Sequence, residues 1–320
     1  MIRTPFAQLF DLQYPIVLGP MGGVAGGRLA AAVSNAGGLG MVGGGYGERA
    51  WLETELALVK ELATRPWGAG FITWNLTEAA LEQVLDAGPS VMMLSFGDPG
   101  KYADSIKARG CRLICQVQDV SGARLARDAG ADVIVAQGTE GGGHGGSRAT
   151  MALLPAVMDA VPDVPVLAAG GIADGRGLAA ALVMGAQGAL MGTRFYATRE
   201  ALGHDQAKQR IVEGRGDDTR RTRVFDIVRG YQWPDGYTGR ALQNAFMRRW
   251  EGHEDELAGR LETEQPAFWK AAQDADYDVA MVWAGEAVDL IDSVPPAAEV
   301  LQSICAQAEQ RLRSVPSLFE

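Results

Sequence analysis

The sequence predicts an α/β protein, a (β/α)8 TIM barrel, on three observations. Short and almost continuously apolar runs, bounded by Gly or Pro, recur along the first two-thirds of its 320 residues. There are eight of them, and segments with helical spacing lie between them. Continuous apolarity is typical of strands that are covered on both faces. Eight strands alternating with helices leave a closed barrel or an open doubly wound sheet, and the count of eight favours the barrel.

The predicted strands follow one another at regular intervals. They occupy residues 15–19, 38–42, 68–72, 90–94, 111–115, 131–136, 165–169 and 187–192. Each starts about twenty to thirty-five residues after the previous one, which is the length of one β/α unit. A dinucleotide-binding sheet would place G-x-G-x-x-G in its first turn. The first turn here, residues 19–26, is rich in glycine but lacks that spacing.

Apolar residues recur at helical spacing between the strands. In residues 48–63, for example, Leu52, Leu56 and Val59 lie on one face. Helices are predicted over residues 28–36, 48–63, 77–87, 99–109, 121–129, 150–160 and 174–184. Residues 298–312 form one further amphipathic helix, which is expected to pack back on the barrel.

The character of the chain changes after Thr198. Residues 205–278 are polar and rich in Arg and Glu, and we interpret them as an inserted helical subdomain and a candidate lid over the barrel mouth. The barrel then comprises residues 1–204 and 279–320. Most aromatic residues of the insertion are expected in its small core, with one or two over the pocket. They are Tyr231, Trp233, Tyr237, Trp250 and Trp269.

Composition narrows the class of partner. The formal net charge is −10, from 29 basic and 39 acidic residues. Nucleic acids and anionic membranes bind basic surfaces, so neither is expected as a partner. One basic cluster interrupts this balance, and it is interpreted as a solvated face. It consists of Arg215, Arg220, Arg221 and Arg223.

The cysteines and the N-terminus favour a cytoplasmic protein. Cys111, Cys115 and Cys305 cannot all pair within one chain and form no C-x-x-C motif, which favours a reducing compartment. Packing is the expected role of the first two. The N-terminus lacks a charged head followed by an apolar run, so no signal peptide is expected. A homo-oligomer is compatible with the sequence, which leaves the oligomeric state open.

One glycine-rich stretch, residues 138–146, follows the sixth predicted strand and contains His144. Glycines allow backbone N–H groups to approach a ligand because no Cβ intervenes. An imidazole in this flexible, open setting is the first candidate for acid–base chemistry. A structural His144 that caps the loop is the alternative. His204 and His253 lie in polar contexts that are typical of the surface.

The role of Glu140 is open between two readings, since it either orients the imidazole of His144 or binds backbone amides of the loop. His144 has no His, Cys or paired carboxylate at metal-ligand spacing, so no metal site is expected. A Ser-His-Asp triad stays open, although the sequence has no G-x-S-x-G elbow.

Two further glycine-rich turns follow the seventh and eighth predicted strands. Backbone N–H groups of Gly170, Gly171, Gly192 and Thr193 are placed to meet one anion, aided by the dipole of the next helix. Barrels with phosphate ligands frequently hold them at these loops. The alternative is that the glycines only turn the chain. A phosphate site beside one histidine, without metal ligands, favours a phosphorylated cofactor.

Four segments together resemble one known family. They are residues 19–21 (GPM), 137–144 (QGTEGGGH), 169–175 (AGGIADG) and 191–195 (MGTRF). Over nearly its whole length, including residues 284–288 (AGEAV), the chain is similar to the nitronate monooxygenase family, formerly called 2-nitropropane dioxygenases. Two positions depart from the family: Gly141 stands where Ala is usual, and Gln116 stands where some members have Lys.

The resemblance implies an FMN-dependent enzyme that oxidises alkyl nitronates, or their neutral nitroalkanes, with O2 to a carbonyl compound and nitrite. His144 aligns with the catalytic histidine of the family, which abstracts the α-proton or binds the nitro group. Residues implied to contact FMN are Pro20, Met21 and Gly22 along the isoalloxazine ring, Asn75 and Gln116 at its polar edge, Gly142 and Gly143 near the flavin, and Ala169, Gly170, Gly171, Gly192 and Thr193 at the phosphate.

Two other functions stay open. Members of the wider family, which this chain resembles nearly as well, are flavin-dependent NAD(P)H reductases of an enoyl thioester or a quinone. A different class is a barrel that binds a phosphate-bearing ligand without redox chemistry. In each case the partner is a small molecule, and the sequence does not identify the physiological substrate.

Overall fold

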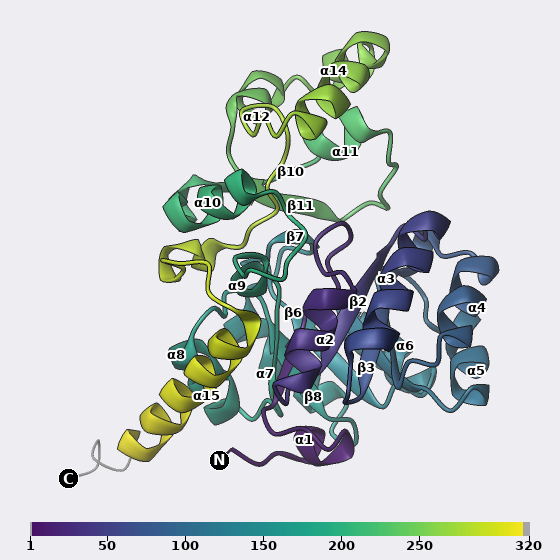
Figure 1. Cartoon of the computed structure of the whole chain (residues 1–320), viewed down its shortest axis with the longest axis vertical. Coiled ribbons are helices and arrows are strands. Elements are labelled where there is room, and N and C mark those ends of the chain that lie inside the picture. Colours follow the sequence, from purple (N-terminus) through teal and green to yellow (C-terminus); the bar gives the residue numbers. More distant parts are fainter. Residues whose placement is uncertain (1, 316–320) are drawn as a thin grey trace.

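A computed structural model describes residues 2–315, and within that range eight parallel strands form one sheet (Figure 1). The strands are β1 (Ile16–Leu18), β2 (Gly40–Gly45), β3 (Trp67–Ile72), β4 (Val91–Ser95), β5 (Arg112–Val117), β6 (Val133–Gln137), β8 (Val166–Ala169) and β9 (Ala189–Met191). Their order is β1-β9-β8-β6-β5-β4-β3-β2, and a parallel bridge between Val17 and Leu39 joins the two ends. The ring therefore closes, and the predicted (β/α)8 barrel is confirmed.

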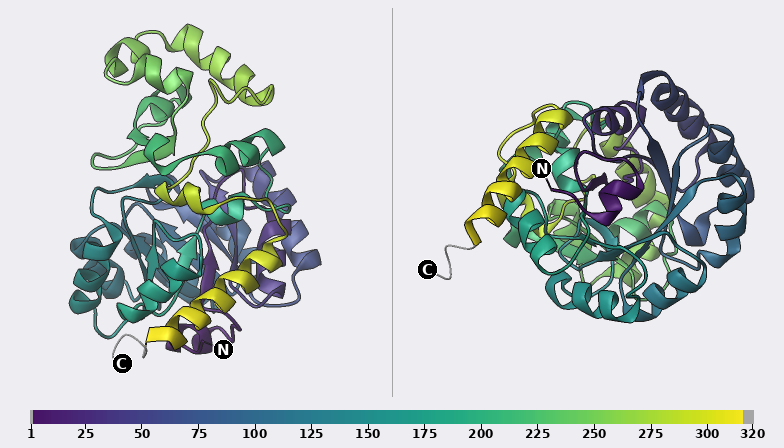
Figure 2. Two further views of the ribbon diagram at one scale, coloured as in Figure 1. Left: turned by 90° about the vertical axis from the view of Figure 1, so that its left-hand side faces the viewer. Right: turned by 90° about the horizontal axis from the view of Figure 1, so that it is seen from below.

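Helices surround the strands as an outer ring, which is visible from below in Figure 2. They are α2 (Gly27–Asn35), α3 (Arg49–Leu62), α4 (Glu78–Asp86), α5 (Gly100–Ala108), α6 (Val120–Asp128), α7 (Thr150–Ala160) and α8 (Gly175–Val183). Side-chain caps fix where several of them begin. Thr77 accepts from the backbone N–H of Ala80, and Asp119 accepts from that of Gly122.

The N-terminal segment covers the lower end of the barrel (Figure 2). Helix α1 (Pro5–Leu9) is capped by Thr4, whose hydroxyl also donates to the carbonyl of Gln187 at 2.7 Å. Phe6 of this helix is fully buried. The short segment is thus held on the barrel by both apolar packing and a hydrogen bond.

Helix α15 (Ala297–Ser314) returns along the barrel and packs against α8 and α2 (Figure 1). The amphipathic helix expected near the end of the chain is therefore confirmed. Of the predicted barrel segments, residue 1 and residues 316–320 lie outside the described residues.

The inserted segment lies above the upper end of the barrel in Figure 1. Its elements are α10 (Asp205–Glu213), β10 (Thr219–Thr222), α11 (Val224–Arg229), β11 (Thr238–Leu242), α12 (Ala245–Trp250), α13 (Glu254–Ala258) and α14 (Leu261–Gln273). The segment differs from a purely helical insertion by the antiparallel ribbon β10–β11, which also pairs with β7 (Gly143–Gly145). The strands of this ribbon are short and find a partner in a distant part of the chain, so the local sequence pattern does not reveal them.

The insertion has a hydrophobic cluster of its own. Phe225, Phe246, Trp250 and Phe268 are buried together there. The core role expected for most aromatic residues of the insertion is thus confirmed for Trp250.

A buried arginine joins the two connections between the barrel and the insertion. Arg194 lies in the short helix α9 (Thr193–Tyr196), directly after β9. Its Nη2 donates to the carbonyls of Ala197 and Ser293, at 2.7 Å each. Ala197 is where the chain leaves the barrel, and Ser293 is where it approaches α15 again.

The three cysteines are free and buried, which agrees with a packing role for Cys111 and Cys115. Among the helices of residues 2–315, none combines the length and the apolar composition that a membrane crossing requires.

Replacing Gly40 by Ala tests the contact between β2 and α2. The added methyl group would overlap the carbonyl oxygen of Ala30, so backbone must shift. We expect the free energy of unfolding to fall by about 1–3 kcal/mol, as for other overpacked sites, measured by urea denaturation. Gly259→Ala is the matched control, because its methyl group would lie 3.5 Å from the nearest atom, the carbonyl oxygen of Glu256. Equal stability of the two variants would contradict this account of the packing.

Candidate active site

A cavity of about 540 Å³ opens at the carboxyl ends of the barrel strands. Such a volume lies within the range of cofactor and small-molecule sites. It brings together all but one of the residues singled out in the sequence. These are Pro20, Met21, Gly22, Gln116, Gly142, Gly143, His144, Ala169, Gly170, Gly171, Gly192 and Thr193.

Asn75 is the exception, because it is not among the residues that line this cavity. It ends a 3-10 turn, Thr73–Asn75, that follows β3. Its Nδ2 donates to the backbone carbonyl of Tyr46 at 3.3 Å. The side chain therefore supports the neighbouring loop, and the structure does not support the expected flavin contact of Asn75.

Glycine backbone forms one wall of the cavity after β8. Gly170 and Gly171 have φ values of +96° and +72°, in the left-handed region that other residues rarely adopt. A Cβ at Gly170 would come within 2.8 Å of the carbonyl oxygen of Gly138. These two positions therefore require glycine, and their bare backbone faces the cavity beside Gly192 and Thr193.

His144 is held from three directions. Its strand, β7, pairs with β11 so that His144 lies opposite Gly239. Its Nε2 is 2.9 Å from both carboxylate oxygens of Asp226. The indole of Trp233 stacks on the imidazole with 3.5 Å between ring centroids and 6° between the planes. The expectation of a flexible, open setting for His144 was wrong, because the loop gains its order from the insertion.

The imidazole of His144 is strongly desolvated, with a side chain 9% exposed. Burial disfavours the charged form and lowers the pKa of His144 below its usual value, whereas the hydrogen bond and charge of Asp226 oppose that shift. The ring is therefore neutral at physiological pH, which is the form that accepts a proton.

Glu140 has the second of the two roles considered for it. Its carboxylate accepts from the backbone N–H of Thr150 at 3.0 Å and from the hydroxyl of Thr150 at 2.8 Å. It thus caps the start of α7. The carboxylate that contacts His144 is instead Asp226 of the insertion.

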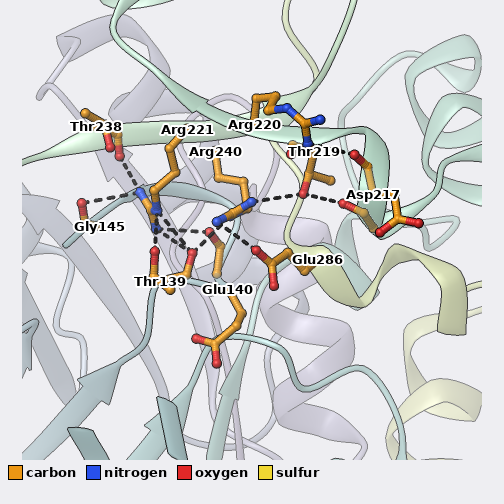
Figure 3. Close-up of polar contacts among 12 residues, drawn as sticks. Thr139, Glu140, Gly145, Asp217, Thr219, Arg220, Arg221, Thr238, Arg240 and Glu286 are labelled. Atoms are coloured by element: carbon orange, nitrogen blue, oxygen red, sulfur yellow. Dashed lines mark hydrogen bonds and ion pairs between the residues drawn. The ribbon is translucent and has the colours of Figure 1, made fainter. Parts of the chain in front are cut away.

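A buried guanidinium ties the insertion to the His144 loop (Figure 3). Arg221 of β10 donates from Nη2 to the carbonyl of Thr139 at 2.9 Å, and from Nη1 to the carbonyls of Thr238 and Gly145 at 2.6 and 3.3 Å. Arg240 of β11 donates to the same carbonyl of Thr139 at 2.9 Å. Burial, with a smaller contribution from Arg240, lowers the pKa of Arg221 to about 10.

The solvated face expected of the basic cluster is therefore wrong for Arg221. Arg215, Arg220 and Arg223 are exposed. The difference arises because Arg221 points from the β-ribbon toward the loop, where unpaired carbonyls are available, and neither feature is visible in the local sequence.

Aromatic rings form the upper wall of the cavity. Tyr46 stacks on Tyr231 with a centroid distance of 3.8 Å, and Nε1 of Trp233 donates to the hydroxyl of Tyr46 at 3.0 Å. Trp233 and Trp269 also line the cavity, as expected for one or two aromatic residues of the insertion. Burial raises the pKa of Tyr46 to about 12, so its hydroxyl stays neutral.

A glutamine relay connects the barrel floor to the histidine loop. Nε2 of Gln116 donates to Oε1 of Gln137 at 3.1 Å, and Nε2 of Gln137 donates to the carbonyl of His144 at 2.9 Å. Sequence reasoning identified Gln116 and His144 but missed the link, Gln137. Its position at the end of β6, directly before the glycine stretch, was the signal that marked it.

Asp226 and Arg229 are the other residues that the sequence analysis missed. Both lie on α11, about eighty residues after the loop they approach. No spacing rule connects segments so far apart. Among the residues that the structure describes, no cluster of three or more His, Cys, Asp or Glu side chains could hold a metal ion.

Comparisons with known proteins place this site in context. A family model described as nitronate monooxygenase matches residues 3–80 and 74–307. The chain is 33% identical over 347 residues to the nitronate monooxygenase of Neurospora crassa, covering 94% of this chain and 90% of that one. It is also 31% identical over 355 residues to a (3aS,4S,5R,7aS)-5-hydroxy-7a-methyl-1-oxo-octahydro-1H-indene-4-carboxyl-CoA dehydrogenase of Mycobacterium tuberculosis, covering 100% and 99%. The structure of FabK from Thermotoga maritima superposes with a TM-score of 0.88 at 31% identity, covering 99% and 100%.

Replacing Arg221 by Met tests how the His144 loop is held. The loop carbonyls lose their donor, so we expect faster amide hydrogen exchange across residues 139–145 and a loss of about 1–3 kcal/mol in the free energy of unfolding. Hydrogen-exchange mass spectrometry measures the first effect and urea denaturation the second. Arg223→Met is the matched control, since Arg223 is exposed. Unchanged exchange in the Arg221 variant would show that β7–β11 pairing suffices.

Proposed function

The chain belongs to the nitronate monooxygenase family, and from this premise we propose that it is an FMN-dependent enzyme that oxidises alkyl nitronates with O2 to a carbonyl compound and nitrite. The observation that carries the proposal is the placement of a neutral, desolvated His144 in the same cavity as the glycine turns after β8 and β9.

The residues of the cavity fit FMN. Its volume suits a molecule of that size, and the positive φ values of Gly170 and Gly171 leave bare backbone where a phosphate needs N–H donors. We propose that Ala169, Gly170, Gly171, Gly192 and Thr193 hold the phosphate, while Pro20, Met21, Gly22, Gly142 and Gly143 border the ring and Gln116 meets its polar edge. When bound, FMN would accept electrons from the substrate and pass them to O2.

His144 supplies the proton chemistry in this proposal. For a neutral nitroalkane, the imidazole takes the α-proton, and the electron pair of the broken C–H bond moves into the nitro group to give the nitronate. A substrate already supplied as nitronate needs no such base. Neutral imidazole suits the task because its pKa is held below the usual range by burial.

We propose that residues 205–278 act as the lid of this site. Trp233 and Tyr231 cover the cavity from the insertion, and Asp226 reaches His144 from the same segment. Aromatic cover excludes water, which strengthens the electrostatic interactions beneath it.

Replacing His144 by Ala tests the assignment of the base. We expect a yellow, FMN-bound protein whose kcat/KM for a neutral nitroalkane falls on the order of 10²- to 10⁴-fold, with a much smaller loss for the preformed nitronate. Oxygen consumption and nitrite release measure both reactions. His253→Ala is the control, because His253 is exposed. Undiminished turnover of the neutral nitroalkane would refute the role of His144.

A second candidate is a flavin-dependent dehydrogenase or reductase of a thioester. It is favoured by similarity to the carboxyl-CoA dehydrogenase and to FabK, at identities that match the similarity to the nitronate monooxygenase. The same cavity and histidine would then serve a bulkier substrate.

Anaerobic mixing with reduced nicotinamide separates these candidates. If the protein is a nitronate monooxygenase, NADH and NADPH leave the flavin absorbance unchanged within the mixing time, whereas a nitronate bleaches it. Stopped-flow absorbance follows both reactions. Rapid bleaching by a reduced nicotinamide would instead support the reductase, and a colourless protein that cannot be reconstituted with FMN would support a binding barrel without redox chemistry.

A further inference from the structure

We propose that Asp226 is a positioning residue that fixes the neutral imidazole of His144 as the Nε2–H tautomer and leaves Nδ1 as the proton acceptor. The assignment of the acceptor rests on the proposed function. The tautomer itself is a property of the free protein and can be measured independently of any reaction.

The geometry of the contact determines where the proton lies. Nε2 of His144 is 2.9 Å from Oδ1 and 2.9 Å from Oδ2 of Asp226. An ionised carboxylate only accepts hydrogen bonds, so Nε2 must carry the hydrogen. Within residues 2–315, Nδ1 of His144 has no protein partner. The lone pair of the neutral ring therefore stays at Nδ1.

Burial makes this choice of tautomer strong. The side chain of Asp226 is 3% exposed, so a broken contact would leave its carboxylate without water to replace the imidazole. Arg229, one turn later on α11, lies 4.0 Å from Oδ1 of Asp226 and compensates its charge. The charges that face His144 are thus Asp226 and Arg229 from α11 and Arg221 from β10.

Trp233 fixes the plane of the same ring. The indole and the imidazole are 6° from parallel, which leaves the ring edge free but blocks one face. Turning the ring over would place a carbon in front of Asp226 and lose the hydrogen bond. Asp226 thus sets the direction of the ring edge, and Trp233 sets its tilt.

Both partners of His144 come from the insertion, whereas His144 itself belongs to a barrel loop. The base is therefore assembled from two parts of the chain, and it has its defined tautomer when the insertion is docked. In the proton step, Nδ1 takes the α-proton of the nitroalkane, and the resulting imidazolium keeps its Nε2–H on Asp226. The carboxylate stabilises the positive charge in the same way as in other His–Asp pairs.

The direct test is the ¹⁵N spectrum of the histidine rings in the FMN-loaded, substrate-free protein. The chain has three histidines, and His204 and His253 are exposed, so a protein labelled at histidine gives three resolvable rings, with His144→Gln for assignment. The nitrogen that carries hydrogen has a distinct shift in each ring. We expect the Nε2–H tautomer for His144 at slightly alkaline pH. A predominant Nδ1–H tautomer would overturn the proposal, whatever reaction the enzyme catalyses.

Asp226→Asn adds a functional arm, with Asp235→Asn as its control. Asp235 is an exposed carboxylate of the same insertion. An amide at position 226 can donate as well as accept, so it no longer selects one tautomer. We expect mixed tautomers and a fall in kcat/KM for the neutral nitroalkane on the order of 10²-fold or more, with no effect from Asp235→Asn.

The pH profile separates a positioning role from a structural one. Asp226 raises the pKa of His144 by its hydrogen bond and its charge, so its replacement by Asn lowers that pKa further. Activity is lost as His144 becomes protonated, and the acid limb of kcat/KM should therefore move to lower pH in Asp226→Asn. An unmoved acid limb with a single Nε2–H tautomer would overturn the proposal. If Asp226→Asn fails to fold, the spectrum of the native protein still decides.

Discussion

Backbone pairing between β7 and β11 is the constraint on which this site depends. Residues 138–146 are mostly glycine, and an isolated chain of that composition would lose much conformational entropy on adopting one shape. Pairing with β11 gives the stretch a defined register, and Arg221 satisfies the carbonyls that the ladder leaves over. The imidazole of His144 then meets Asp226 and Trp233 without any further rearrangement.

The barrel could be predicted from the sequence because its strands are buried on both faces, and each of the eight apolar runs overlaps an observed strand. The glycine turns of the site were recognisable for a similar reason, since left-handed backbone at Gly170 and Gly171 requires that residue. The partners of His144 were not predictable. Asp226 is an ordinary acidic residue of a short helix, and only the fold brings it within 2.9 Å of the ring. Arg221 was misassigned because a buried arginine has the same local sequence as an exposed one.

Two opposing effects set the electrostatics of the site. Desolvation lowers the pKa of His144, and the neighbouring carboxylate raises it, with desolvation the larger effect. The insertion supplies both the cover that removes water and the carboxylate that compensates for its removal. A change in how the insertion docks would therefore alter the proton affinity and the orientation of the ring together.

The guanidinium of Arg194 has a topological consequence. Because it holds Ala197 and Ser293 with one nitrogen atom, the exit and re-entry points of nearly a hundred residues are kept side by side. For the barrel, the whole insertion is then equivalent to a short surface loop with pinned ends, and the entropy of closing that loop varies little with its length. Segments of different size and chemistry can be accommodated between the same two anchor points without displacing a single barrel strand.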